Sequence, residues 1–180
     1  MRIGIDIDGV ICDLVKNILI ITKEMYGFNL RKEDIYKHEI HEVLGLEKDS
    51  FGKVFVRALS SLNHPAVKGA VTYINKLKKK HKIILVTSRP KRFNRITREW
   101  LRMNNIDYDK LVNIKSEKHT KLGGFDFFID DHLGEIVFAS RIKGLKSILF
   151  DQPWNKSFNM ENSFVRVRTW RKIYSLIENK

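Results

Sequence analysis

Short apolar runs recur along this 180-residue chain, and four of them end in, or directly before, side chains that carry oxygen. Their length and their content of β-branched residues are typical of buried strands. Amphipathic stretches with helical spacing lie between them, for example at 71–77, 96–103 and 136–142. Strands that alternate with helices predict an α/β fold with a parallel sheet covered on both faces. The predicted strands are 3–6, 83–86, 111–114, 125–129 and 147–150.

The polar residues at the ends of these runs form the candidate site. Because the carboxyl ends of parallel strands lie at one edge of a sheet, these side chains are expected to converge there. Four of them, the carboxylates of Asp6, Asp8, Asp130 and Asp131, repel one another unless a cation lies among them. Ligands that are all oxygen favour Mg²⁺ over zinc. The residues concerned are Asp6, Asp8, Thr87, Ser88, Asp130, Asp131, Asp151 and Gln152.

The segment that follows the first strand interrupts the alternation. It contains no strong strand pattern and predicts helices at 14–25, 32–43 and 50–62. We therefore expect a small helical cap, residues 14–64, inserted into a core domain made of residues 1–13 and 65–180. Near the other end, 164–168 alternates like an edge strand. We also expect Gly144 to end the helix before the last strand, and Thr169 to cap a final helix through Ile177.

The charge is strongly positive and uneven. The chain has 34 Lys and Arg against 21 Asp and Glu, and residues 71–121 hold 15 of the former against 4 of the latter. Such a segment either attracts phosphate-bearing ligands, nucleic acid included, or consists of solvated helix faces. The lone cysteine, Cys12, excludes an internal disulfide framework, and no apolar stretch is long enough for a signal peptide or a membrane helix. These features predict a cytoplasmic protein without membrane contact.

The motifs at the strand ends resemble those of the haloacid dehalogenase superfamily of phosphohydrolases. They are the segments 6–10 (DIDGV), 86–90 (VTSRP) and 128–131 (FIDD), with a lysine before the last strand of the set. A further likeness to the 5′(3′)-deoxyribonucleotidase-like branch rests on 64–70, 149–155 and 166–170. The resemblance implies a Rossmann-like sheet with a compact cap.

The resemblance also implies a role for each site residue. Asp6 would attack phosphorus to form an aspartyl-phosphate, and Asp8 would protonate the leaving oxygen and then activate water. Gly9 would allow a sharp turn beside the phosphate. Thr87 or Ser88 would bind phosphoryl oxygens, and Arg89 would line the phosphate site. Mg²⁺ would be held by Asp6, the Asp8 backbone carbonyl and Asp130, with Asp131 either as a further ligand or as a support for the ligands.

The lysine that neutralises charge at the phosphate can be placed in three ways. Lys115, Lys118 and Lys121 all precede the strand that ends at Asp130. The family pattern puts the lysine just past a strand end, at the start of a short helix. If 111–114 is the strand, Lys118 fits this pattern best, followed by Lys115.

Three hypotheses about function follow. The first is a Mg²⁺-dependent phosphatase acting on a small phosphomonoester, above all a nucleotide. The second is a phosphatase that acts on nucleic-acid ends and docks them on the basic segment 71–121. The third is a module without catalytic activity that binds nucleic acid or protein, against which the set of Asp6, Asp8, Thr87 and Asp130 argues.

Overall fold

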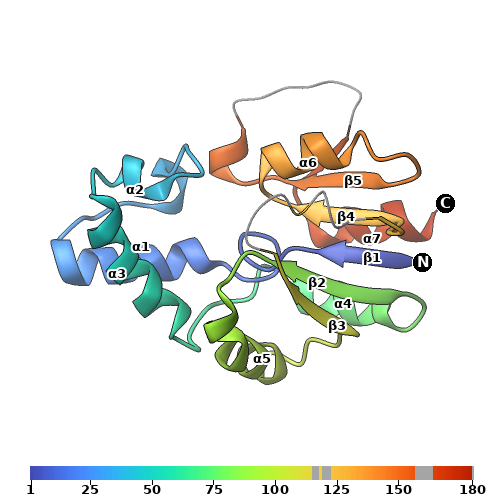
Figure 1. Cartoon of the computed structure of the whole chain (residues 1–180), viewed down its shortest axis with the longest axis horizontal. Helices are drawn as coiled ribbons and strands as arrows, with labels where there is room; N and C mark the ends of the chain where they lie inside the picture. Colours follow the sequence, from blue (N-terminus) through green and yellow to red (C-terminus); the bar gives the residue numbers. More distant parts are fainter. Residues whose placement is uncertain (115–117, 119–122, 157–163, 180) are drawn as a thin grey trace.

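The sheet of this computed structural model has six parallel strands in the order β3-β2-β1-β4-β5-β6 (Figure 1). The structure describes residues 1–114, 118, 123–156 and 164–179. The strands are β1 (Arg2–Ile5), β2 (Lys82–Thr87), β3 (Lys110–Asn113), β4 (Phe127–Asp130), β5 (Lys146–Phe150) and β6 (Val165–Val167). The parallel α/β prediction is confirmed, and 164–168 indeed supplies an edge strand.

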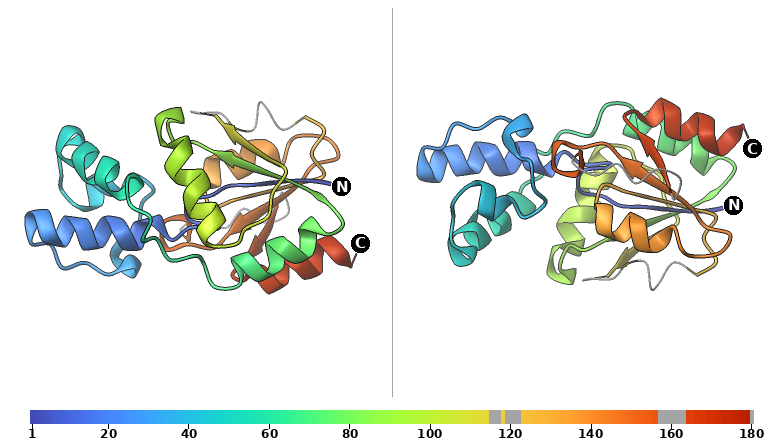
Figure 2. Two further views of the ribbon diagram at one scale, coloured as in Figure 1. Left: turned by 90° about the horizontal axis from the view of Figure 1, so that it is seen from below. Right: turned by 90° about the horizontal axis from the view of Figure 1, so that it is seen from above.

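Side chains alternate between the two faces of the sheet, as the pleat of a strand requires. Ile83 and Leu85 pack into the larger core, which also contains side chains of α4 (Ala70–Lys78), α5 (Asn94–Met103) and α7 (Trp170–Glu178). Ile84 and Val86 belong to a smaller core on the other face, together with α6 (Leu133–Ala139). β1 lies inside the sheet, between β2 and β4, and helices lie on both faces of the sheet (Figure 2).

Two long helices, α1 (Leu14–Tyr26) and α3 (Lys48–Leu59), lie beyond the carboxyl ends of the strands (Figures 1 and 2). They pack through buried apolar side chains, among them Ile18 on α1 and Val54 on α3. The two connections to the sheet are joined by backbone hydrogen bonds, from Asp13 N–H to the Pro65 carbonyl (2.9 Å) and from Val67 N–H to the Ile11 carbonyl (2.7 Å). The helical segment therefore leaves and re-enters the sheet at one place.

The predicted helix 32–43 is wrong. The segment instead forms a 3₁₀ turn, η1 (Lys32–Asp34), and a four-residue helix, α2 (Ile40–Val43). The Asp34 carboxylate accepts a hydrogen bond from the Arg31 backbone N–H at 2.8 Å. Short acidic side chains that bond to nearby backbone in this way close a turn and compete with helix propagation. The helix predicted at 50–62 is displaced towards the N-terminus, to 48–59.

Gly144 does not end a helix, contrary to expectation. α6 ends at Ala139, and the Ser140 hydroxyl donates a hydrogen bond to the Val137 carbonyl at 2.8 Å. Gly144 has a φ of +84° in the turn that leads into β5. The predicted cap of the last helix is confirmed, because the Thr169 hydroxyl accepts from the Lys172 N–H at the start of α7.

In the described part of the chain, no helix is both long and apolar enough to span a membrane.

Candidate active site

The turn after β1 is built around a glycine. Asp6 follows the strand and donates its backbone N–H to the Ile129 carbonyl at 2.9 Å, which extends the pairing with β4. Gly9 has a φ of +82°, and a Cβ atom at this position would lie 2.4 Å from Oδ2 of Asp131. Only glycine accepts both this conformation and this close approach. The sharp turn expected at Gly9 is confirmed, and it brings the Asp6 loop against the Asp131 loop.

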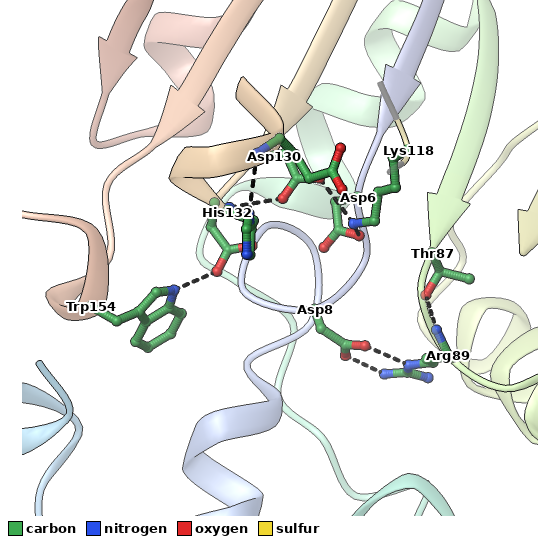
Figure 3. Close-up of polar contacts among 10 residues, drawn as sticks. Asp6, Asp8, Thr87, Arg89, Lys118, Asp130, His132 and Trp154 are labelled. Atoms are coloured by element: carbon green, nitrogen blue, oxygen red, sulfur yellow. Dashed lines mark hydrogen bonds and ion pairs between the residues drawn. The ribbon is translucent and has the colours of Figure 1, made fainter. Parts of the chain in front are cut away.

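Three carboxylates from the ends of β1 and β4 form a tight cluster (Figure 3). Oxygens of Asp6, Asp130 and Asp131 all lie within 4.8 Å of one another, and the three residues are 4%, 0% and 5% exposed. Asp130 is oriented by the backbone N–H of His132, which donates to its Oδ1 at 2.8 Å. This donor set of buried carboxylate oxygens fits a hard divalent cation such as Mg²⁺.

Lys118 is the lysine that reaches this cluster. Its Nζ lies 2.5 Å from Oδ1 of Asp6 and 2.9 Å from Oδ2 of Asp130, and the residue is 6% exposed. Burial lowers the pKa of the Lys118 ammonium, but the charges of Asp130 and Asp6 outweigh it and raise that pKa. Lys115 and Lys121, the alternatives, lie outside the described residues. The geometry favours Lys118 as the cation of the site.

The charges of the cluster do not balance. Burial raises the pKa of the Asp6 carboxyl to about 8; Lys118 opposes this rise, and the charges of Asp130 and Asp8 add to it. Burial and the charge of Asp130 also raise the pKa of Asp131. Among the described residues, the Lys118 ammonium is the one cation that contacts this cluster, through Asp6 and Asp130. It compensates the charge of the three carboxylates incompletely, and a bound divalent cation would supply further positive charge.

Arg89 pairs with the Asp8 carboxylate. Its Nε and Nη2 donate to the two oxygens of Asp8 at 2.8 and 2.6 Å, and its Nη1 donates to the Thr97 hydroxyl at 3.1 Å. The residue is 3% exposed. These protein partners hold the guanidinium beside Asp8, and a contact of Arg89 with substrate stays a prediction. The sequence carries no signal for this pairing, because the two residues are 81 positions apart.

The two hydroxyl residues after β2 differ in exposure. Thr87 is 1% exposed, and its hydroxyl accepts from the Arg89 backbone N–H at 3.2 Å. Ser88 is exposed and lines a cavity of about 250 Å³ between the strand ends and the helical segment, as do Asp8 and Asp131. The apolar part of the lining comes mainly from α1 and α3, through Leu14, Val15, Ile18, Phe51 and Phe55. The segment around α2 adds His38, Glu39, Ile40 and His41.

The loop after β5 reaches the site through Gln152, as the sequence predicts, and also through Trp154 and Asn155, which the sequence does not indicate. The indole N–H of Trp154 donates to Oδ2 of Asp131 at 2.6 Å. Gln152 donates to the Gly9 carbonyl at 2.5 Å, and Asn155 donates to the Asp131 carbonyl at 2.8 Å. Asp151 points elsewhere and pairs with Arg166 at 2.6 Å. Neither the strand-end pattern nor the family likeness of 149–155 reveals the contacts of Trp154 and Asn155 with Asp131.

Comparisons with known proteins identify the family of the chain. The family model described as 5′ nucleotidase, deoxy (pyrimidine), cytosolic type C protein matches residues 1–180. The Bacillus subtilis protein YqfW is 24% identical over 184 residues, covering 99% of this chain and 94% of that protein. A Clostridium acetobutylicum protein named as a nucleotidase is 23% identical over 183 residues, covering 99% and 94%.

Solved structures show the same fold at low sequence identity. A haloacid dehalogenase-like hydrolase from Streptococcus pneumoniae superposes with a TM-score of 0.68 at 12% identity and covers 98% of both chains. YfnB of Bacillus subtilis, solved with bound magnesium, has a TM-score of 0.66 at 13% identity and also covers 98% of both chains. The fold is therefore that of the haloacid dehalogenase-like hydrolases.

Proposed function

The chain belongs to the cytosolic type C 5′-nucleotidase family of phosphoric monoester hydrolases, and from this premise we propose that it is a Mg²⁺-dependent nucleotidase acting through an aspartyl-phosphate on Asp6. The observation that carries the proposal is the buried cluster of Asp6, Asp130 and Asp131 with Lys118, which adjoins a largely apolar cavity. We also propose the division into a core, residues 1–13 and 65–180, and a cap, residues 14–64.

The first half of the proposed reaction transfers the phosphoryl group to the protein. A carboxylate oxygen of Asp6 forms a bond to phosphorus while the bond from phosphorus to the nucleoside oxygen breaks, and Asp8 gives that oxygen a proton. Lys118 lies 2.5 Å from Asp6 and stabilises negative charge on the nucleophile and the transferring group. Ser88 and Thr87 would donate to phosphoryl oxygens. Mg²⁺, when bound by Asp6, Asp130, Asp131 and the Asp8 carbonyl, supplies further positive charge.

In the second half, water hydrolyses the aspartyl-phosphate. Asp8 removes a proton from the water while the water oxygen forms a bond to phosphorus. The bond between phosphorus and Asp6 breaks, which regenerates the Asp6 carboxylate and releases inorganic phosphate. The Asp8 carboxylate faces Arg89 in this structure (Figure 3). It must therefore turn from Arg89 towards Asp6 in order to exchange protons at the phosphorus centre.

The cavity favours a phosphomonoester with a large, partly apolar body. Phe51 and Phe55 from α3 line it with their rings stacked, 6.1 Å between centroids, beside Ile18 and Val15 of α1. Aromatic rings of this kind stack on planar bases, and the apolar walls accept a base and sugar once the phosphate lies near Asp6. This lining supports a nucleoside monophosphate over a small sugar phosphate.

The proposed function is tested by phosphate release from a panel of phosphomonoesters. The panel contains 5′- and 3′-ribo- and deoxyribonucleotides, sugar phosphates and phosphoglycolate, each measured with Mg²⁺ and after chelation. We expect nucleotides to be the preferred substrates and turnover to require the metal. Preference for a substrate without a base, or turnover that survives exhaustive chelation, contradicts the proposal.

Asp130→Asn is expected to raise the Mg²⁺ concentration needed for half-maximal turnover by about tenfold or more. The amide keeps the size of the side chain but removes a charge that faces the cation, and metal affinity depends on ligand charge. It also removes one of the two carboxylates that contact Lys118. The measurement is turnover as a function of Mg²⁺ for wild type and variant. An unchanged Mg²⁺ dependence would show that Asp130 is not a ligand.

The second candidate function, action on nucleic-acid ends, rests on the exposed cations of α5. Arg95, Arg98 and Arg102 lie on its solvent face. Arg102 is already paired with Glu99 at 2.7 Å, and Arg98 donates to the Tyr108 hydroxyl at 3.3 Å. These partners support the interpretation of a solvated helix face.

Replacing Arg95, Arg98 and Arg102 together by glutamine is therefore expected to leave mononucleotide turnover within about twofold of wild type at any salt concentration. Catalytic contacts are few and buried, whereas docking of a polyanion would release counterions and depend steeply on salt. The measurement compares a mononucleotide with an oligonucleotide bearing a terminal phosphate between low and high salt. A strong, salt-sensitive preference for the oligonucleotide that the triple variant abolishes would favour the second function instead.

A further inference from the structure

Trp154 connects the carboxylate cluster to the helical segment. It lies in η4 (Pro153–Asn155), directly after β5, and its indole N–H donates to Oδ2 of Asp131 at 2.6 Å. The face of the same ring lies against Lys32 of η1, with Nζ 5.6 Å from the ring centroid. Lys32 in turn pairs with Asp13 at 2.9 Å, at the start of α1. One half-buried side chain thus contacts both a proposed metal ligand and a cation of the proposed cap.

The loop that carries Trp154 is itself held firmly. Asn155 is 2% exposed and donates to the carbonyls of Asp131 and Phe150, both at 2.8 Å. Gln152 is 5% exposed and donates to the Gly9 carbonyl. These bonds fix the backbone of the loop against both acidic turns. The indole is therefore presented to Asp131 from a rigid support.

We propose that Trp154 is a positioning residue that orients Asp131 towards the bound cation and links this orientation to the cap through Lys32. The inference rests on the proposed function, because it assumes that Asp131 binds Mg²⁺. A carboxylate offers several lone-pair directions, and a donor fixed on Oδ2 determines which remain for the metal. Mutation of a residue that hydrogen-bonds to a metal ligand commonly weakens metal affinity by about 10- to 100-fold.

The link to the cap follows from the position of the Lys32 ammonium over the face of the Trp154 ring. A positive charge over an indole attracts its electron density, which makes the N–H a better hydrogen-bond donor to the carboxylate at its edge. The His38 ring of the helical segment also lies edge-on to His132, with 4.3 Å between centroids, one residue beyond Asp131. The segment therefore contacts the neighbourhood of Asp131 at two places. Closure of the cap over a substrate and binding of Mg²⁺ are expected to favour each other.

The first arm of the test is Trp154→Phe, which retains an aromatic ring for Lys32 but removes the N–H. Calorimetric titration of metal-free protein with MgCl₂ is expected to show a Kd about 10- to 100-fold weaker than wild type. Turnover at saturating Mg²⁺ is expected to recover to within a few-fold. Trp100→Phe is the matched control, because that indole N–H donates to the His64 carbonyl at 3.0 Å, away from the carboxylates. The control is expected to lose stability and keep its Mg²⁺ Kd.

The second arm is Lys32→Met, which leaves the indole and its N–H in place and so remains informative if Trp154→Phe folds poorly. We expect the Mg²⁺ Kd to weaken by about two- to fivefold in the wild-type background and to stay unchanged in a Trp154→Leu background. Equal effects in both backgrounds would refute the link to the cap. A wild-type Mg²⁺ Kd in Trp154→Phe would refute the positioning role. If wild-type protein itself binds no Mg²⁺, the metal dependence of the proposed function is refuted. If wild-type protein binds Mg²⁺ and Trp154→Phe binds it equally well, only the positioning role of Trp154 is refuted.

Discussion

Asp6→Asn is expected to lower turnover by about a thousandfold or more, while nucleotide binding survives. The amide has nearly the size of the carboxylate and retains an acceptor for Lys118, but it has no charged oxygen to attack phosphorus, and loss of a covalent nucleophile has effects of this order. The measurement is turnover and substrate affinity at saturating Mg²⁺, for a preparation free of wild-type enzyme. Asp107→Asn, an exposed carboxylate elsewhere on the surface, serves as the control.

The same variant is expected to unfold at a temperature no lower than wild type when metal is absent. Burial and the neighbouring charges of Asp130 and Asp8 raise the pKa of Asp6 to about 8, despite Lys118, so the charged form of this residue is costly in the folded state. A neutral amide removes part of that repulsion. Turnover close to wild type would exclude Asp6 as the nucleophile, and a large loss of stability would show that the activity loss reflects unfolding.

Lys118→Met is expected to reduce turnover by about 100- to 1000-fold, the range found when one group that stabilises a transition-state charge is removed. The ammonium lies between Asp6 and Asp130, 2.5 and 2.9 Å from their oxygens, and methionine fills a similar volume without charge. Lys115→Met and Lys121→Met are the matched controls and are expected to keep near wild-type turnover. If one of these controls loses activity instead, the catalytic lysine is assigned to that position.

Lys118→Met also makes a prediction about stability. Removing one partner of a buried ion pair leaves an uncompensated charge and costs about 3–5 kcal/mol. Three buried carboxylates then face one another without the ammonium, so metal-free protein is expected to be markedly less stable and to regain stability when Mg²⁺ is added. The measurement is thermal unfolding with and without Mg²⁺. A wild-type unfolding temperature without metal would contradict the arrangement of charges described above.

The identity of the strands and the convergence of Asp6, Asp130 and Asp131 could be predicted from sequence alone. Apolar runs such as 83–86 are local signals, and the parallel arrangement puts every carboxyl end at one edge. Helix ends were less accurate, as at 32–43 and Gly144, because single hydrogen bonds decide them: the Asp34 carboxylate accepts one from nearby backbone, and the Ser140 hydroxyl donates one to it.

The partners of the site residues could be decided only by tertiary structure. Arg89 is 81 positions from Asp8, and Trp154 is 23 positions from Asp131, yet each donates directly to that carboxylate. The local sequence pattern identifies the residues that follow each strand, without information from other parts of the chain. Which donor faces which carboxylate depends on how loops from different strands pack at one edge, since hydrogen bonds require both correct distance and direction. For that reason the sequence determined the chemistry of this site, and the packing of its loops determined how Arg89 and Trp154 take part in it.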